Sequence, residues 1–158
     1  MTIRPAAAAD RGAVWRILEP VMRAGETYPL PRDMSRDEGL AYWFGAEHEV
    51  FVAWEGEAIV GTYYIKANQK GGGSHVANCG YVAAASARGV GRAMCEHSLA
   101  RAKARGFRAM QFNFVVSSNA RAVHLWQSCG FAIVGRLPSA FNHPTLGYVD
   151  ALVMHRLI

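Results

Sequence analysis

The sequence has few cysteines, and they follow no pattern of a disulfide or metal framework. Cys79, Cys95 and Cys129 are odd in number, widely spaced and form no C-x-x-C pair. Small secreted domains use paired cysteines as staples, whereas cytosolic proteins keep their thiols reduced. The six histidines also lack the spacing of metal ligands. We therefore expect a cytoplasmic protein that holds no metal.

Long apolar runs and basic runs are also missing. No stretch approaches the roughly 18 consecutive apolar residues of a membrane span. The first residues, MTIRPAAAADRG, lack the apolar centre of a signal peptide. The formal net charge is +5, but the arginines are scattered and no run of five Lys or Arg occurs. We expect no membrane segment and no nucleic-acid partner, and the excess positive charge suits a small polyanionic ligand.

The chain of 158 residues, 51% of them hydrophobic, is long enough to bury the core of one domain, which we assign to residues 1–158. Alternating apolar patterns predict strands, and 3-4 spacing with capping residues predicts helices. Strands are expected at 2–4, 50–54, 58–67, 75–82, 109–116, 132–137 and 148–157, with a proline-bearing loop over 139–147. Helices are expected after an Asp10 cap through residue 22, after a Ser35 capping box through 44, and over 89–105 and 119–129. This order predicts an α/β domain whose mixed, mostly antiparallel central sheet is flanked by helices.

The loop with the most chemical content is VAAASARGVGRAM, from Val82 to Met94, where a strand leads into a helix. Small side chains let a ligand approach the backbone, and the unpaired N–H groups at a helix start bind phosphates. The Lys-Ser/Thr pair of a Walker loop is missing, and a dinucleotide fingerprint would need a third glycine three residues after Gly91, where Met94 stands. Taken alone, the loop is equally consistent with a packed strand-to-helix corner.

Two motifs together resemble the GNAT superfamily of N-acetyltransferases. The loop S-A-R-G-V-G-R-A is similar to that superfamily's pyrophosphate loop, Q/R-x-x-G-x-G/A. Further along, the superfamily has an asparagine and an A-x-x-L-Y-x-x-x-G-F-like run, which here reads Asn119, Ala122, Leu125, Trp126, Gly130 and Phe131. The motifs and the element order agree over essentially the whole chain. The resemblance implies a GNAT-like fold, acetyl-coenzyme A as donor and an amine as acceptor.

The resemblance also implies a set of cofactor-binding residues. The pyrophosphate would lie on backbone N–H groups of Ala87, Arg88, Gly89, Val90, Gly91, Arg92 and Ala93. Val82 would bind the pantetheine arm as a pseudo-strand, and Asn119 would contact the cofactor from the next helix. A β-bulge in the Val82 strand, with Gly80 in the distortion, would part that strand from 109–116 and open a slot. Ser86 departs from the pattern, which has Gln or Arg there.

Acetyl transfer to an amine requires a neutral amine and a stabilised leaving thiolate. Many relatives protonate the thiolate with a tyrosine at the position of Trp126, but an indole N–H can only donate a hydrogen bond. We expect positioning and backbone N–H groups near Val82 to carry most of the rate, with Trp126 either as a donor or as packing. Asn78 stands where several relatives have a carboxylate, which leaves Glu26 as the best candidate base. Asp150 is expected to pair with an arginine or to face a cleft.

The acceptor is expected to be a small molecule. The stretches GETYPLP and AFNHPTLGYVDALVM resemble a branch that acetylates small amino-acid-like amines. Asn78 and Asn113 are candidate donors to such a substrate, and Tyr28 and Tyr148 are candidate walls. The alternatives are a protein or peptide N-acetyltransferase, which needs an open groove, and an acyl-coenzyme A-binding domain without catalysis. Superfamily members often pair through late strands, so a homodimer is a further expectation.

Overall fold

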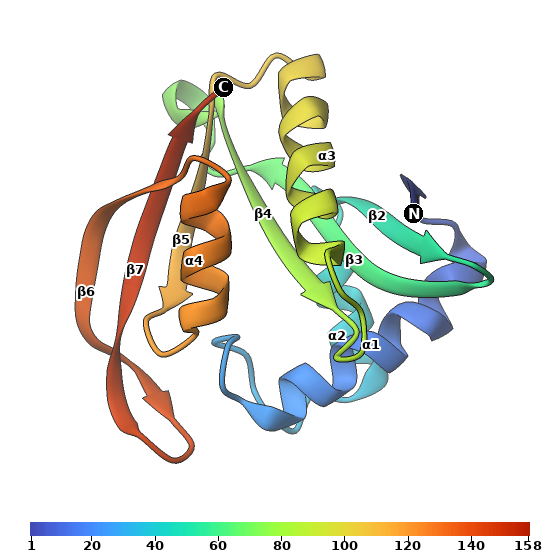
Figure 1. Cartoon of the computed structure of the whole chain (residues 1–158), viewed down its shortest axis with the longest axis horizontal. Helices are drawn as coiled ribbons and strands as arrows, with labels where there is room; N and C mark the ends of the chain where they lie inside the picture. The colour runs from blue at the N-terminus through green and yellow to red at the C-terminus, as the bar shows by residue number, and fades with distance from the viewer.

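Seven strands form one mixed sheet in the order β1-β2-β3-β4-β5-β7-β6 in the computed structural model, which describes residues 1–158 (Figure 1). Only β4 and β5 pair in parallel, so the predicted mixed, mostly antiparallel sheet is confirmed. The strands are β1 (Thr2–Pro5), β2 (Glu49–Glu55), β3 (Ala58–Ala67), β4 (Val76–Ala83), β5 (Ala109–Val116), β6 (Ala132–His143) and β7 (Gly147–Leu157).

Four helices cover the two faces of this sheet. The helices are α1 (Arg11–Ala24), α2 (Arg36–Trp43), α3 (Val90–Ala104) and α4 (Ala120–Ser128). One core cluster joins α1 and α2 to one sheet face, and a larger cluster joins α3 and α4 to the other. Figure 1 shows α3 and α4 side by side in front of the sheet. No helix combines the length and the apolar character that crossing a membrane requires.

The predicted caps of the first two helices have different outcomes. The Ser35 capping box is confirmed, because Ser35 Oγ accepts from the Glu38 N–H at 3.1 Å and Glu38 accepts from the Ser35 N–H at 2.8 Å. Asp10 does not cap α1 with its side chain. Its carboxylate instead accepts from the Ala7 N–H and pairs with Arg4 at 2.7 Å, which closes a 3₁₀ turn ahead of the helix.

The predicted loop over 139–147 is mostly wrong, because β6 continues to His143. Pro138 lies inside β6 without breaking it, since β6 is the edge strand and an edge proline costs no ladder hydrogen bond on its open side. The register with β7 shifts between Leu137 and Phe141, and Ser139 has a φ of 49°. The Ser139 N–H donates to Asp150 at 2.9 Å, which holds this irregular turn of the strand.

β4 and β5 separate soon after they begin. They pair only at Val76 with Ala109 and at Ala77 with Met110. The predicted separation is therefore present, but the predicted bulge in β4 is wrong: β4 pairs with β3 without a break, and the irregularity lies in β5, between Phe112 and Val115. A Cβ on Gly80 would lie 2.5 Å from the Tyr64 ring, so Gly80 makes room for an aromatic side chain and is not part of a distortion.

Candidate active site

The loop between β4 and α3 presents a row of unpaired backbone donors. None of the N–H groups from Arg88 through Arg92 has a hydrogen-bond partner in the chain. The N–H groups of Ala87 and Ala93, also expected in the cradle, are not free, because Ala87 donates to the Ala84 carbonyl and Ala93 makes the first helical bond to the Gly89 carbonyl. Gly89 has a φ of 73°, which favours glycine, and a Cβ there would meet no atom within 4 Å. Five consecutive donors at an open helix start fit the diphosphate of coenzyme A.

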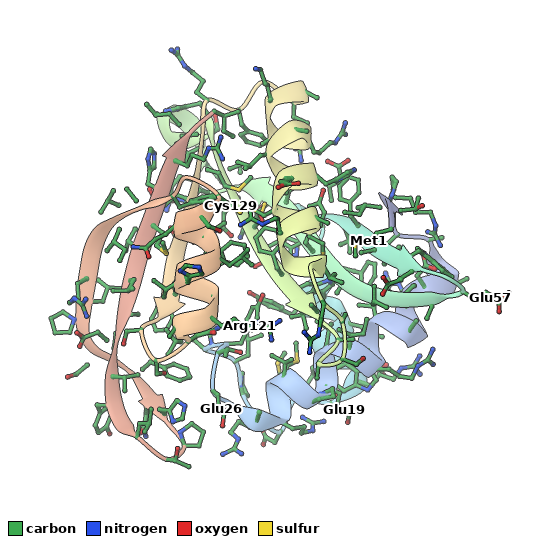
Figure 2. The ribbon with its side chains drawn as sticks, in the orientation of Figure 1. Met1, Glu19, Glu26, Glu57, Arg121 and Cys129 are labelled. Carbon is green, nitrogen blue, oxygen red and sulfur yellow. The ribbon has the colours of Figure 1, made fainter.

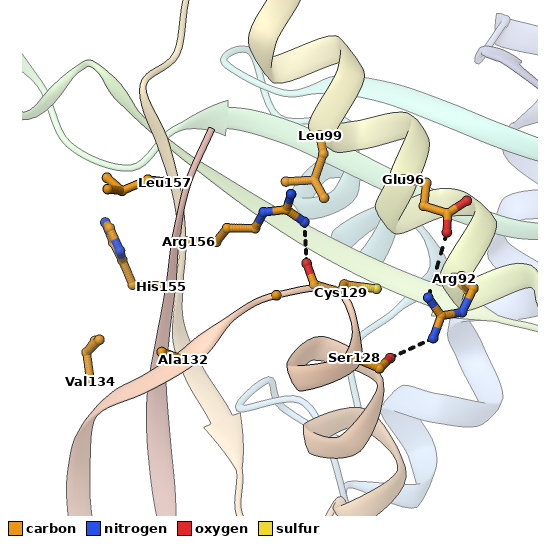
Figure 3. A pocket seen from close by; sticks show the side chains of 11 residues that line it. Arg92, Glu96, Leu99, Ser128, Cys129, Ala132, Val134, His155, Arg156 and Leu157 are labelled. Atoms are coloured by element: carbon orange, nitrogen blue, oxygen red, sulfur yellow. Dashed lines mark hydrogen bonds and ion pairs between the residues drawn. The ribbon is translucent and has the colours of Figure 1, made fainter.

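Side chains around this loop have distinct roles. A Cβ on Gly91 would lie 2.9 Å from Leu125, so this glycine allows the start of α3 to approach α4. Arg88 is exposed and makes no ion pair or side-chain hydrogen bond. The guanidinium of Arg92, expected beside the loop opening, instead donates to Ser128 Oγ at 2.7 Å and lies 3.7 Å from Glu96 (Figure 3). The backbone N–H of Arg92 therefore belongs to the row of donors, whereas its guanidinium lines an outer hollow of about 730 Å³ between α3, α4 and β7.

The register of β4 decides which of its backbone groups face the gap. Hydrogen bonds from Ala84 to Val60 and from Asn68 to Val76 show that the even-numbered residues of β4 bond to β3. The N–H and C=O of Val82 are therefore directed to β3, which contradicts the expected pantetheine contact at that residue. The groups that face the gap belong to odd-numbered residues, among them Tyr81 and Ala83.

Tyr28 reaches this part of β4 from the loop between α1 and α2. Its phenol donates to the Tyr81 carbonyl at 2.9 Å, in place of the β5 partner that the separated strand lacks. Burial raises the pKa of Tyr28 far above its ordinary value. Tyr28 is therefore a neutral donor at physiological pH and not a base.

Trp126 lies on the other face of the gap, within an aromatic cluster. Its ring centroid is 4.9 Å from that of Tyr81 and 5.0 Å from that of Phe112. Trp126 is 9% exposed, and its indole N–H makes no hydrogen bond in the chain. Trp54 Nε1 is the sole fully enclosed side-chain polar atom without a partner, so the Trp126 N–H is open to an incoming ligand. The tryptophan is thus both a packing residue and a free donor.

Asn119 begins α4 as its cap, with Oδ1 accepting from the Ala122 N–H at 3.3 Å. Its Nδ2 makes no hydrogen bond in the chain. Because α3 follows β4 and α4 follows β5, both helices begin where the two strands have parted (Figure 1). The expected cofactor residues Gly89 and Asn119 therefore flank the same opening, each with free N–H donors.

The two candidate asparagines belong to a chain of amides on the α1 and α2 face. Asn78 Nδ2 donates to the Gln111 carbonyl at 2.9 Å and so links β4 to β5 just beyond their last register pair. Gln111 Nε2 donates to Asn113 Oδ1 at 2.9 Å, and Asn113 Nδ2 donates to Asn68 Oδ1 at 2.6 Å. Asn78 has no group that could take a proton, and its amide holds the strands at the start of their separation.

The candidate carboxylates do not meet in this region. Glu26 is exposed, makes no hydrogen bond or ion pair, and lies at the edge of the molecule in Figure 2. Asp150 pairs with Arg136 at 2.8 Å, which confirms the first of its two expected environments. The Ser139 N–H and then Arg136 lower the pKa of Asp150. Burial raises the pKa of the Cys79 thiol to about 12, so it is protonated at neutral pH and a poor nucleophile.

A cleft of about 320 Å³ lies between the loop that follows α1 and the end of the β6–β7 hairpin. Its lining residues are Gly25, Tyr28, Pro29, Leu30, Arg32, Phe141, Asn142, His143 and Pro144. Phe141 makes an edge contact of 6.2 Å between ring centroids with Phe114 of β5. Through Phe114 and the Tyr28 bond to Tyr81, the cleft adjoins both strands of the gap. Tyr148 and Glu26 are not among the lining residues, and Tyr148 is 72% exposed.

Sequence patterns did not point to three groups that the structure places at the cleft or at the gap: Arg32, His143 and the backbone of Tyr81. Strand alternation could have assigned Tyr81 to the gap once the register with β3 was known. Arg32 lies one residue beyond the quoted stretch GETYPLP, and His143 lies within the tail that was expected to be a loop. The histidines do not gather, and no three His, Cys, Asp or Glu side chains lie close enough together to hold a metal ion.

Comparisons with known proteins agree with this architecture. The model of the acetyltransferase (GNAT) family matches residues 13–131. The N-acetyltransferase aca1 of Schizosaccharomyces pombe is 30% identical over 150 residues, which cover 82% of this chain and 71% of that protein. A GCN5-related N-acetyltransferase from Kribbella flavida is 39% identical and has a TM-score of 0.93, with 99% and 97% of the two chains covered. A phosphinothricin acetyltransferase from Sinorhizobium meliloti, solved with acetyl-CoA, shares the fold at 21% identity, a TM-score of 0.85 and 99% and 88% coverage.

Proposed function

Because this chain belongs to the acetyltransferase (GNAT) family and is thus an acetyl-CoA-dependent N-acetyltransferase, we propose that its acceptor is a primary or secondary amine of a small molecule. We further propose that the amine attacks directly, with both substrates bound. The observation that carries the proposal is the cleft of about 320 Å³ beside the gap between β4 and β5. A site of this size, walled by a proline-bearing loop and a hairpin, suits a small ligand better than an extended peptide.

The residues of the loop and the two strands would hold acetyl-CoA. The unpaired N–H groups of Arg88 through Arg92 bind the diphosphate, and Asn119 contacts the cofactor through its free Nδ2. The pantetheine contact moves from Val82 to the gap-facing backbone of Tyr81 and Ala83. The co-substrate supplies an acetyl group activated as a thioester.

Chemistry at the gap would depend on position and on neutral donors. The N–H groups of Tyr81 and Ala83 both face the gap, so one would bind the pantetheine arm and the other would stabilise the negative charge that develops on the acetyl oxygen. Such backbone donors often provide the largest single stabilisation of a transition state. The Trp126 N–H donates to the sulfur without giving up its proton. No carboxylate lines the cleft, so water takes the proton from the acceptor amine. Water or the product amine then gives a proton to the coenzyme A thiolate. Glu26 acts as a base only if the loop moves it inward.

Acceptor residues are proposed on the same grounds. Tyr28 walls the cleft and fixes the end of β4, whereas Asn113 and Asn78 present amides beside the gap. Tyr148 stands on the hairpin outside the cleft. The long edge strand β6, with exposed Ile133 and Val134, supports the expected pairing of two copies through late strands. The three free cysteines fit the proposed cytoplasmic location.

Release of free thiol from acetyl-CoA over a panel of amines tests the acceptor class. The panel contains small amino acids, their carboxamides, polyamines and a peptide with a free N-terminus. We expect turnover with one or more of the small amines and little with the peptide. Turnover confined to the peptide would overturn the small-molecule assignment in favour of a protein or peptide acetyltransferase.

A further inference from the structure

The acceptor cleft carries cationic and donor groups but no acid. Among its nine lining residues the ionisable side chains are Tyr28, which is neutral, Arg32 and His143, and there is neither Asp nor Glu. We propose that the acceptor is an amine that also bears a carboxylate, and that Arg32 binds this carboxylate and so determines specificity. This inference rests on the proposed function, because it names the substrate class of the same site.

Arg32 is held in place by contacts that leave its charge free. Its stem packs over Gly25, where a Cβ would lie 2.5 Å from Arg32 Cδ. Its Nε donates to the Arg23 carbonyl at 2.8 Å, and the Arg23 guanidinium donates in return to the Arg32 carbonyl. No carboxylate lies within ion-pair distance of Arg32, and its two terminal nitrogens make no hydrogen bond. A fixed guanidinium with two free nitrogens matches the two oxygens of a carboxylate.

His143 adds a ring N–H donor on the opposite wall. Its Nδ1 lies 3.2 Å from the N–H groups of both Thr145 and Leu146 and accepts from them. Because Nδ1 accepts these bonds, the ring N–H is on Nε2, which can donate. The two walls thus offer donors from different elements, Arg32 from the α1–α2 loop and His143 from the hairpin. A cleft with donors on both walls and no acid repels a second cation and favours an anionic group.

The same loop orients the other end of the acceptor. Tyr28 lies between Gly25 and Arg32 in sequence, and its phenol contacts β4 at Tyr81. An acceptor anchored by its carboxylate at Arg32 would direct its amine past Tyr28 into the gap. The reciprocal hydrogen bonds of Arg23 and Arg32 fix the two ends of this loop, so the anchor and the wall move together.

The experiment compares wild type, Arg32→Gln and Arg23→Gln with paired acceptors: glycine, alanine and proline against their carboxamides. Arg32→Gln removes the charge from the cleft. Arg23→Gln removes the hydrogen bond to the Arg32 carbonyl and leaves that charge in place. We expect Arg32→Gln to raise KM for the acids about 10-fold or more, because hydrogen bonds to charged groups are the strong ones. In Arg32→Gln, KM for the carboxamides should change less than about 2-fold. Arg23→Gln should change KM by the same factor for each acid and its carboxamide. Calorimetric titration of the same acids and carboxamides into protein with coenzyme A repeats the comparison without turnover.

The outcomes separate this inference from the proposed function. An equal effect of Arg32→Gln on acids and carboxamides, an unchanged KM for the acids, or a wild-type preference for carboxamides would overturn the role of Arg32 while small-molecule acetylation stands. If no small amine is acetylated, the proposed function fails. Calorimetry then still tests whether Arg32 binds carboxylates, and binding of the acids that is lost in Arg32→Gln supports this role. Absence of such binding refutes it.

Discussion

The phenol of Tyr28 donates a hydrogen bond to the backbone carbonyl of Tyr81, 2.9 Å away, across 53 positions of sequence. This contact replaces a ladder bond that β4 lost when β5 separated from it. A buried carbonyl without a donor is costly, so the phenol stabilises the opened strand. A side chain from the loop that follows α1 thus supports the separated strand, and it links the proposed cofactor slot to the proposed acceptor cleft.

Tyr28→Phe should lower kcat/KM for the acceptor by about 3- to 10-fold, the equivalent of roughly 1 kcal/mol for a neutral hydrogen bond. Affinity for coenzyme A should change little, because the diphosphate contacts are unaffected. Tyr42→Phe is the matched control, since its hydroxyl contacts only the Tyr64 hydroxyl at 3.3 Å. Steady-state kinetics check the prediction, and equal effects of the two variants would contradict it.

Trp126→Phe should remain an active enzyme. The phenylalanine ring preserves contact with Tyr81 and Phe112 and removes one hydrogen-bond donor, so kcat should fall by less than about 10-fold. Single-turnover acetyl transfer at saturating substrates measures this, with coenzyme A affinity determined separately. Loss of nearly all turnover with cofactor affinity intact would mean that the indole is essential to the chemistry, contrary to a rate based on positioning.

Asn113→Ala should raise the acceptor KM more than it weakens cofactor binding, because its amide lies in the β5 bulge beside the gap. Removal of one neutral hydrogen bond predicts a change of several-fold. Asn68→Ala breaks the same side-chain bond from the other end and is the control. If the two variants match each other, or if KM and cofactor affinity change equally, Asn113 has only a structural role.

Asp10→Asn should destabilise the fold in a pH-dependent way. The Arg4 side chain, assisted by the Ala7 N–H, lowers the pKa of Asp10 in the folded chain. A lowered pKa means that the folded state holds the proton less tightly than the unfolded state, whose carboxyl titrates near about 4. The contribution of Asp10 is therefore fully present above that pH and is lost as the pH falls through the folded-state pKa.

At pH 7 the loss should be about 1.5 to 3 kcal/mol of unfolding free energy, the range for hydrogen bonds to a charged group. Urea unfolding at pH 7 and at pH 3 measures the loss. Asp33→Asn is the control, because the Asp33 side chain is exposed and makes no hydrogen bond or ion pair. The difference between wild type and Asp10→Asn should shrink at pH 3. A difference that stays constant or grows would show that the ion pair is not its source.

Local patterns in the sequence were sufficient for most of the fold. The Ser35 capping box, the glycines at 89, 106 and 130 and the alternating strands all act over a few residues, so each could be recognised without tertiary information. The strand predicted over 132–137 ended too early, because a proline usually ends a strand and Pro138 follows it. Its place at the sheet edge, which only the tertiary structure determines, makes Pro138 harmless.

The candidate site was harder to predict, because long-range register decides it. A shift of one residue in β4 exchanges Val82 for Tyr81 as the group that faces the gap, and no local pattern gives that parity. The bulge in β5 and the Tyr28 contact with Tyr81 also join segments far apart in the chain. The proposed diphosphate loop, by contrast, would act through its own backbone, so a local glycine pattern was sufficient to predict it, and the unpaired N–H groups of Arg88 to Arg92 lie within the predicted stretch.

Calorimetric titration of coenzyme A tests the central claim, that backbone N–H groups from Arg88 to Arg92 bind its diphosphate. Wild type should give saturable heat for one site. Gly89→Ala should weaken binding about 10-fold or more, because alanine disfavours a φ of 73° and adds a methyl group at the open cradle. Gly56→Ala, with a φ of 59° and equally open surroundings, should bind like wild type. No heat from folded wild type, or unchanged binding in Gly89→Ala, would contradict the account.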